Sequence, residues 1–502
     1  MARVPPADRP YRLTKSRYVK GLICRKALWL QEHDPARAGP RSPAQQRILD
    51  QGTAVGLLAA ERFPAGVLVK AAPYERERAL AETRQALGSG APAVFEAAFL
   101  HHRTLVRVDV LRRTEAGAWD LIEVKSSTKV KEEHLPDAAV QRYVAEGSGL
   151  RVAGVYLMHL NPECAFPDLS DLFVLEDVGE PVAELLPEVG GKLDELLRLL
   201  EESSEPRVPV GPQCTSPWEC EFKAWCWRNV PSVSVFNVPL LKSEAKAELS
   251  ARGILEIADI PADFPLAPTS RRFVELFLGG RARVDWPAIR RELAGLTRPL
   301  YFLDFETDNP AVPRFPGLHP FERLPFQFSC HRLDSDGELA HFEYLHVAAS
   351  DPRPPLARTL GETLGPAGTV VAYNASFEKG VLGELAVFLG PGPLAAKLEA
   401  AAGRLWDLLA IFRDHYLDPA FGGSNSLKNV LPALLPAFSY EGLEVAGGEE
   451  AMAAWELLLR LPEGAEKRSL EAALRAYCRQ DSLAMVEIYR FLTQRAASPI
   501  TE

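Results

Sequence analysis

A short apolar run that contains two acids places the strongest constraint on how this chain can fold. The run covers residues 300–307 (LYFLDFET), and its acids are Asp304 and Glu306. Side chains two positions apart on a strand point to the same face of the sheet, so the two carboxylates lie next to each other. The apolar neighbours predict a buried strand, where two charges are costly unless a cation compensates them. The run therefore predicts a sheet core that carries a divalent metal site.

Two later motifs add polar groups of the kind that such a site uses. Asn374 and Glu378 follow a short apolar strand in the pattern N-x-x-F-E. Residues 474–483 predict a helix on which Tyr477 and Asp481 are four positions apart, and residues at that spacing share one face of a helix. These side chains are therefore candidates to join the two acids of the strand.

The three motifs, in this order, resemble those of the DnaQ-like 3′–5′ exonucleases of the RNase H fold. The pattern Y-x-x-x-D is typical of the tyrosine (DEDDy) subclass, and Glu378 stands where most relatives have Asp. The resemblance implies catalysis with two metal ions. Asp304, Glu306 and Asp481 would hold Mg²⁺ or Mn²⁺. Tyr477 would orient the attacking water.

Two further polar residues of this region have candidate roles. Lys428 lies at the start of a predicted helix, and its ammonium is a candidate to contact a phosphate. Asp407 is either a further acid of the site or the acid that begins a helix, and its position before an apolar helical run favours the second interpretation.

A hairpin over residues 105–127 predicts a second group of charged side chains. Asp109 lies late on one strand, and Glu123 and Lys125 lie two positions apart on the next, so they share a face. An acid pair beside an ammonium is an arrangement that can cleave phosphodiesters, although a solvated hairpin edge would carry the same residue types. Glu96, on the preceding strand, is either a third metal ligand or an ordinary edge residue.

The pattern D…E-x-K between apolar runs resembles the RecB-like branch of the PD-(D/E)XK nucleases. The resemblance implies that Asp109 and Glu123 bind Mg²⁺ or Mn²⁺ and that Lys125 stabilises charge at the scissile phosphate. Such enzymes carry a Gln and a Tyr on the next helix that support the site or hold the strand. Gln141 and Tyr143 are the candidates here, with a spacing that departs from the usual one.

Three of the seven cysteines form a spaced group. An odd number of cysteines argues against a disulfide framework. Cys214, Cys220 and Cys226 follow the pattern C-x5-C-x5-C and need a fourth ligand, for which Cys24 is the candidate. One early and three late cysteines resemble the 4Fe–4S nucleases of the RecB-like group. The resemblance implies a 4Fe–4S cluster, with Zn²⁺ as the alternative that four thiolates also suit.

The length of 502 residues predicts two to four domains. The motifs predict an α/β, multidomain chain. Residues 1–230 would form a PD-(D/E)XK restriction-endonuclease-like core with the cluster, and residues 298–502 an RNase H-like exonuclease domain. Residues 231–297 would be a helical connector, either a plain linker or a helix–hairpin–helix that can hold a DNA phosphate. Near the start, residues 11–31 predict a loop and one amphipathic helix.

Composition limits the possible partners and the compartment. A net charge of −10 does not suggest a bulk nucleic-acid binder, but basic residues crowd the start of the chain and surround the hairpin. No run of about 18 apolar residues is present, so no membrane span is expected. The first 21 residues lack the apolar core of a signal peptide, which predicts a cytoplasmic protein.

The whole chain resembles an uncharacterised bacterial family that fuses a RecB-like nuclease to a DnaQ-like exonuclease. The resemblance implies a metal-dependent nuclease that hydrolyses DNA at two sites. Single-stranded ends would be its substrates, in repair, recombination or defence. Two alternatives remain open from the sequence. One is a nucleic-acid-binding iron–sulfur scaffold with one degenerate nuclease site, and the other is an exonuclease that processes RNA.

Overall fold

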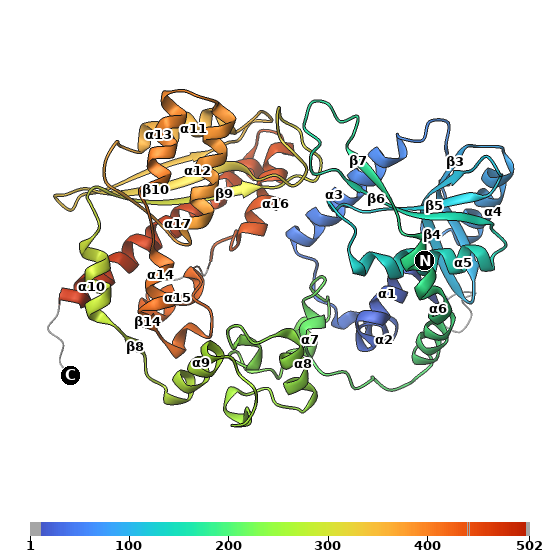
Figure 1. The fold of residues 1–502 in the computed structure, drawn as a ribbon, viewed down its shortest axis with the longest axis horizontal. Helices are drawn as coiled ribbons and strands as arrows, with labels where there is room; N and C mark the ends of the chain where they lie inside the picture. Colours follow the sequence, from blue (N-terminus) through green and yellow to red (C-terminus); the bar gives the residue numbers. More distant parts are fainter. Residues whose placement is uncertain (1–11, 439, 441, 498–502) are drawn as a thin grey trace. The chain divides into compact units, whose positions relative to one another are not determined.

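The computed structural model describes residues 12–438, 440 and 442–497 of the chain, which forms two compact α/β units (Figure 1). The first unit takes the chain up to Asn229 together with the segment Ala311–Phe321. The second takes Val230–Pro310 and the chain from Glu322 onward, so the expected connector belongs to it. Within the described part, none of the helices combines the length and the apolar character that a membrane crossing needs.

The first unit is built on a seven-stranded mixed sheet. Its strand order is β2-β3-β4-β5-β6-β7, and β1 pairs in parallel with the start of β4. The strands are β1 (Leu13–Thr14), β2 (Val67–Leu68), β3 (Ala93–His101), β4 (Thr104–Arg113), β5 (Trp119–Val124), β6 (Val152–Leu160) and β7 (Phe173–Asp177). Adjacent residues of β5 show how both faces are covered, because Leu121 enters one apolar core and Ile122 enters another on the opposite face.

Helices pack on both faces of this sheet. They are α1 (Lys15–Ile23), α2 (Arg25–His33), α3 (Pro43–Ala60), α4 (Arg76–Gly88), α5 (Leu135–Gly147), α6 (Gly179–Leu199) and α7 (Lys223–Cys226). The prediction of a single helix over residues 11–31 is wrong, because the backbone of Cys24 is extended (φ −153°, ψ 109°) and separates α1 from α2. The thiol of Cys24 then begins α2 by accepting a hydrogen bond from the amide of Ala27 at 3.4 Å.

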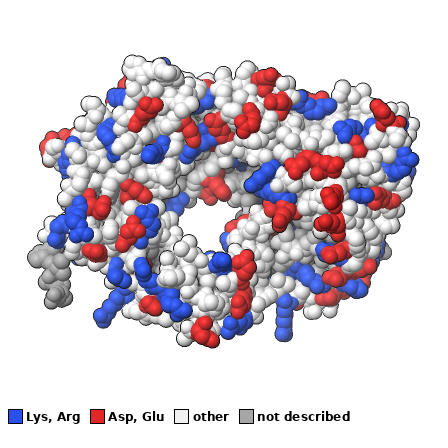
Figure 2. All heavy atoms as spheres, viewed as in Figure 1, with Lys and Arg blue, Asp and Glu red and all other residues white. Residues whose placement is uncertain are grey.

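Basic side chains near the start of the chain are paired with acids of the same unit. Arg12 and Arg17 contact the carboxylate of Glu32 at 3.3 and 2.7 Å, and Lys20 pairs with Glu221. On the face seen in Figure 2, basic and acidic side chains are interspersed. These basic residues therefore hold the beginning of the chain against the rest of its unit.

The second unit is built on a five-stranded mixed sheet of order β11-β10-β9-β12-β13. The strands are β9 (Leu300–Asp308), β10 (Leu324–Leu333), β11 (Leu339–Leu345), β12 (Thr369–Ala372) and β13 (Leu405–Asp407), and β8 (Arg283–Val284) pairs with β14 (Tyr416–Leu417). The central strand β9 is antiparallel to β10 and parallel to β12. Phe302 and Leu303 of β9 enter separate apolar cores, so the acid-bearing strand is covered on both faces, as its apolar sequence predicts.

Helices flank this sheet and fill the segment before it. They are α8 (Ser243–Ala251), α9 (Pro268–Gly279), α10 (Trp286–Ala294), α11 (Arg353–Thr363), α12 (Ala375–Leu389), α13 (Pro393–Ala402), α14 (Leu408–Asp414), α15 (Leu427–Leu434), α16 (Gly448–Arg460) and α17 (Ala465–Ala497). After α8, Gly253 takes a positive φ of 77° and the chain enters a short 3-10 turn at Ile257–Asp259. The second helix of a helix–hairpin–helix is therefore replaced by three residues of 3-10 helix.

Candidate active sites

The first group of charged residues lies where β4 and β5 separate. The two strands pair from Arg113↔Trp119 to Val110↔Ile122, and their register ends there. One residue further along β4, the carboxylate of Asp109 accepts a hydrogen bond from the amide of Val124 at 2.8 Å. The side chain thus satisfies a backbone donor on the separating strand, and its second oxygen remains available to the site.

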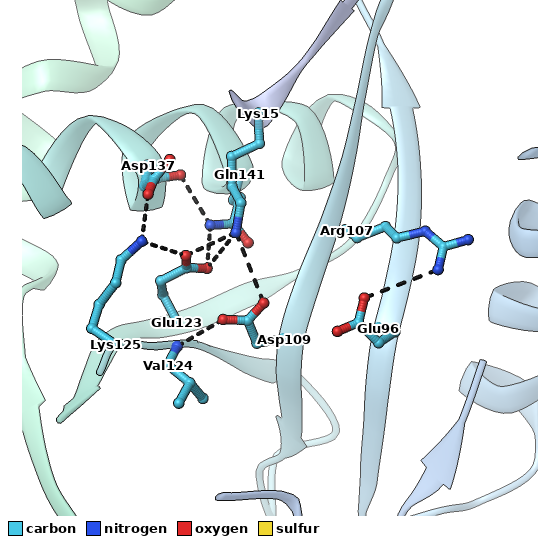
Figure 3. A network of polar contacts seen from close by, with 9 residues as sticks. All are labelled: Lys15, Glu96, Arg107, Asp109, Glu123, Val124, Lys125, Asp137 and Gln141. Carbon is cyan, nitrogen blue, oxygen red and sulfur yellow. Dashed lines mark hydrogen bonds and ion pairs between the residues drawn. The ribbon is translucent and has the colours of Figure 1, made fainter. Parts of the chain in front are cut away.

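Glu123 is the centre of this site (Figure 3). Its carboxylate is 1% exposed and accepts hydrogen bonds from Lys15 at 2.8 and 2.9 Å, from Lys125 at 2.8 Å and from Gln141 at 2.6 Å. Burial acts to raise the pKa of Glu123, but the ammonium groups of Lys15 and Lys125 outweigh it and hold that pKa below its usual value. Glu123 is therefore a buried carboxylate with its charge fully compensated.

Asp109 is held in a different charge environment. Burial, reinforced by the charge of Glu123, raises the pKa of Asp109 to about 7, and Lys15 opposes the rise. The Nζ of Lys15 lies 3.8 Å from Asp109 Oδ1. Lys125 pairs instead with Glu123 and with Asp137. The ammonium of Lys15 is therefore the cation shared by both acids of the pair.

Sequence reasoning missed Lys15. Its position follows from β1, which pairs Leu13 and Thr14 with the start of β4 and so delivers the next residue to the acids. One local signal was present. Lys15 is the first residue of α1, whose first turn contains no acid, although the helix dipole favours negative charge there. A basic residue in that place indicates a partner outside the helix.

The expected supporting residues of this site divide into two groups. Gln141 bonds Glu123 directly. Tyr143 instead contacts the ring of His102, with 3.0 Å between its hydroxyl and Nδ1. Glu96 lies on the other side of Asp109 and points toward Arg107, at 4.0 Å (Figure 3). Of the three, Gln141 alone is in direct contact with an acid of the pair among the hydrogen bonds of the described residues.

The second group of acids lies on the central strand of the second unit. Ligand atoms of Asp304, Glu306 and Cys478 lie within 4.8 Å of one another, an arrangement that can hold a metal ion. The Cys478 thiol donates to Asp304 Oδ2 at 3.4 Å. The two acids come from β9 and the thiol comes from α17. Cys478 therefore lies at the site as a potential ligand.

Asp481 and Tyr477 reach the same place from α17. Asp481 Oδ1 accepts a hydrogen bond of 2.5 Å from the hydroxyl of Tyr440, and Tyr477 also bonds this carboxylate. Lys428 Nζ lies 3.3 Å from the Tyr477 hydroxyl and 5.1 Å from the centre of its ring. Glu306 is also affected, because the charge of Lys428 acts to lower its pKa. Tyr440 lies in no motif, so sequence reasoning did not find it.

Glu378 approaches the acids from the first turn of α12. It is 3% exposed, and among the described residues its Oε2 is a buried atom without a hydrogen-bond partner. Asn374 precedes it in a left-handed conformation (φ 73°). Asp407 accepts from the amides of Asn374 at 3.0 Å and Leu409 at 3.1 Å, and it caps α14. Asp407 is therefore a helix-start acid that also holds the turn before Glu378.

The carboxylates of the second site repel one another. Burial raises the pKa of Asp304 well above its usual value, and the charges of Asp481, Glu306 and Glu378 raise it further. Burial and Asp481 raise the pKa of Glu306 to about 8, and burial raises the pKa of Glu378 to about 8. The fold thus disfavours the charged forms of these carboxylates when no cation is present. This, together with the Glu378 oxygen that lacks a hydrogen-bond partner among the described residues, fits residues that bind a dication.

The four candidate cysteine ligands are electrostatic neighbours in the first unit. Burial raises the pKa of Cys220 to about 11, and Cys24 and Cys214 add to the rise. Burial also raises the pKa of Cys226, again with contributions from Cys214 and Cys24. Among the described residues, the group of three potential ligands close enough to hold one metal ion is that of Asp304, Glu306 and Cys478. The four thiols do not form such a group there.

Comparisons with known proteins match parts of the chain. A family model described as a domain of unknown function (DUF2779) matches residues 301–426, which contain the first two acid motifs of the second unit. The uncharacterized protein MG366 homolog of Mycoplasma pneumoniae is 32% identical over 136 residues, 24% of this chain and 20% of that protein. The uncharacterized protein MG366 of Mycoplasma genitalium is 24% identical over 234 residues, 43% and 34% of the two chains. The matches thus span about a third or less of the length of these relatives.

Proposed function

We propose that this chain is a metal-dependent nuclease whose second unit degrades nucleic acid from its 3′ end. The observation that carries the proposal is the convergence of four acids from three elements, namely Asp304 and Glu306 from β9, Glu378 from α12 and Asp481 from α17. Asp304 is half-buried and the other three are buried. Such a cluster is costly unless cations compensate it. The central position of β9 in a mixed sheet also supports the resemblance to the RNase H-like exonucleases.

The side chains around the acids have separate parts in this reaction. Bound divalent ions would supply an activated water and would stabilise the leaving oxygen. Tyr477 would orient the attacking water through its hydroxyl, which already bonds Asp481. Lys428 lies beside that hydroxyl, where its ammonium can contact the phosphate. Tyr440 would help to keep the Asp481 carboxylate in place through its hydrogen bond to Oδ1.

The proposal includes the first unit as a second, RecB-like nuclease site. Asp109 and Glu123 would hold the ion, Lys125 would stabilise charge at the phosphate, and Gln141 would keep Glu123 in place. One observation favours the rival function, a nucleic-acid-binding unit with a degenerate site. It is the contact of Lys15 with both acids, which already supplies a cation to them.

The test uses single- and double-stranded DNA and RNA labelled at the 5′ end, with Mg²⁺ or Mn²⁺. Stepwise shortening of single-stranded DNA is expected, and it should disappear in Asp304→Asn. Activity that survives in Asp304→Asn and is lost when Asp109→Asn is added would belong to the first site. Shortening of RNA in preference to DNA would favour the RNA-processing alternative. If both single variants degrade every substrate at the wild-type rate, the nuclease proposal is rejected.

The position of Cys478 leads to a prediction about thiophilic metals. Sulfur ligands select softer ions than carboxylates do, and binding must displace the proton of a buried thiol. Co²⁺ is therefore expected to give thiolate-to-cobalt charge-transfer absorption that Cys478→Ser reduces, while the d–d bands of carboxylate-bound cobalt remain. Cys330→Ala is the matched control, because Cys330 is equally buried on the neighbouring strand β10. Identical wild-type and Cys478→Ser spectra would exclude Cys478 as a ligand.

We propose further that Cys24, Cys214, Cys220 and Cys226 bind a 4Fe–4S cluster, with Zn²⁺ as the alternative. Cys24 lies at the break between α1 and α2, and the other three lie near the end of the first unit. Other contacts also join these two parts of the chain, including the pair Lys20–Glu221 and a hydrogen bond of 2.7 Å from the amide of Gly39 to the Glu221 carbonyl. A cluster would therefore join two parts of the chain that the fold already holds together.

Protein purified without oxygen is expected to be brown and to absorb near about 400 nm. Iron and sulfide analysis should give about four of each per chain, and Cys226→Ser should lower both. Cys164→Ala is the control, because Cys164 is a buried cysteine of the same unit that bonds the carbonyl of Asp168. A colourless protein that contains one zinc per chain would reject the iron–sulfur cluster and favour the zinc alternative.

A further inference from the structure

The ammonium of Lys15 contacts the carboxylate oxygens that a metal ion would bind in the first unit. It contacts Glu123 Oε1 and Oε2 at 2.8 and 2.9 Å, and it is 3.8 Å from Asp109 Oδ1 (Figure 3). Asp109 Oδ2 is turned away toward the amide of Val124. The carboxylate oxygens between the two acids are therefore already close to a cation that the chain itself supplies, the ammonium of Lys15.

The fold holds Lys15 in this position. Thr14 pairs with β4 at Leu105, and its hydroxyl accepts from the amide of Arg17 and so begins α1. The start of the lysine side chain is therefore fixed on both sides, by a strand and by a helix. Its side chain is 23% exposed, which leaves room for its flexible end to move toward solvent.

A dication and an ammonium on one carboxylate would repel each other strongly. Metal–oxygen distances for Mg²⁺ are about 2.0–2.1 Å, so an ion on Glu123 would lie within about 5 Å of an ammonium that is 2.8–2.9 Å from the same oxygens. Lys125 also bonds Glu123, but Asp137 gives it a second anionic partner outside the acid pair. Lys15 has both of its anionic partners within the acid pair among the ion pairs of the described residues.

We propose that Lys15 is a positioning residue of the first site, and that its ammonium competes with a divalent metal ion for the oxygens of Glu123 and Asp109. The proposal rests on the proposed function of that site as a metal-dependent nuclease. A phosphate that enters the site offers the displaced ammonium a new anionic partner. Metal and nucleic acid therefore bind cooperatively at the first site, and each increases the affinity of the other by the same factor.

The test measures Mn²⁺ binding directly, from the electron paramagnetic resonance signal of free Mn²⁺. All variants carry Asp304→Asn and Glu306→Gln, which remove two carboxylates of the second site. In this background Lys15→Met is expected to bind Mn²⁺ at least tenfold more tightly than the chain that keeps Lys15. Lys15→Gln, which keeps hydrogen-bond donors without the charge, is the second variant in case Lys15→Met does not fold. Asp109→Asn should remove the tighter binding and so assign it to this site.

Lys20→Met is the matched control. Lys20 lies on the same helix and pairs with Glu221 outside the site, so its loss should leave the Mn²⁺ affinity unchanged. In the chain that keeps Lys15, a short phosphorothioate oligonucleotide should tighten Mn²⁺ binding, and in Lys15→Met it should have a smaller effect. Equal or weaker binding in both Lys15 variants would overturn the role of Lys15. Absence of Mn²⁺ binding at this site in every variant would instead reject the proposed metal site itself.

Discussion

Asp304→Asn should make the metal-free protein more stable while it removes the proposed 3′–5′ degradation. The carboxylate is half-buried beside Asp481, Glu306 and Glu378, and its raised pKa means that the folded state disfavours its charge. A neutral amide of the same shape relieves this repulsion. We expect a gain of about 1 kcal/mol, or roughly 2–4 °C in Tm for a unit of this size. Activity should fall by about a thousandfold, the cost of losing a group that stabilises the transition state.

The pH dependence of this gain is part of the prediction. The pKa of Asp304 is raised in the folded state, so its cost to stability is absent below the ordinary carboxyl pKa of about 3.9 and grows as the pH rises above it. The advantage of Asp304→Asn should therefore vanish in acid. Thermal unfolding in a chelator, over a series of pH values, measures it. Added Mn²⁺ should reverse the order, because the wild type then gains the ion as a ligand.

Asp336→Asn is the control for this experiment. Asp336 is an exposed acid in the turn between β10 and β11, where it accepts from the amide of Glu338 at 3.0 Å. Asp336→Asn should not lower the activity, and it should not raise the stability as Asp304→Asn does. A less stable, inactive Asp304→Asn would mean that the aspartate serves the fold, and the metal-site interpretation would lose its main support.

Glu123→Ala should have the opposite effect on stability in the first unit. Its carboxylate is the common acceptor for Lys15, Lys125 and Gln141, and removing one member of a buried charged group leaves its partners uncompensated. We expect a loss of about 3–5 kcal/mol, the range observed when one partner of a buried ion pair is deleted. Hydrogen exchange read by mass spectrometry should show faster exchange in β4, β5 and α5, with the second unit unchanged.

Asp120→Ala is the matched control for Glu123→Ala. Asp120 lies on the same strand and is 6% exposed, but among the ion pairs of the described residues its cationic partner is Arg112 alone, at 2.7 Å. Its removal should cost clearly less, because the side chain of Arg112 is 38% exposed and can be solvated. Similar exchange rates in Glu123→Ala and the wild type would contradict the central position of Glu123 in the first site.

The two acid sites therefore differ in how their charge is balanced before any ion binds. In the first unit, Lys15 and Lys125 compensate Glu123, so a dication must displace or tolerate ammonium groups. In the second unit the acids raise one another's pKa values, and Lys428 only partly opposes this. On the proposed function, the second site would therefore bind metal more readily, and the first would depend more on its substrate.

The motifs in the sequence were sufficient to place several of these residues. The alternation around Asp109 predicts β4, and the spacing of Tyr477 and Asp481 predicts a shared face of α17. The apolar neighbours of Asp304 predict a buried strand, and β9 is covered on both sides. Such local periodicity is set by residues close in the chain, which is why it can be read without the fold.

Other members of the sites could not be read in this way. Tyr440 reaches Asp481 across 41 positions, and Lys15 reaches Glu123 across 108. Cys478 is next to Tyr477 in the sequence, yet its role as a potential ligand depends on its distance from β9. The expected helix over residues 11–31 failed for a related reason, because the extended backbone at Cys24 is not visible in the helical periodicity.

By itself the sequence determined which carboxylates lie on apolar strands and helices, and so which residues are candidates to bind metal ions. The tertiary structure alone decided the charge balance of each site. It brought a lysine to Glu123 by pairing β1 with β4, and it brought a thiol and further acids to Asp304. The physical reason is that electrostatic energy depends on separation through space, and spacing along the chain does not specify that separation for residues on different elements.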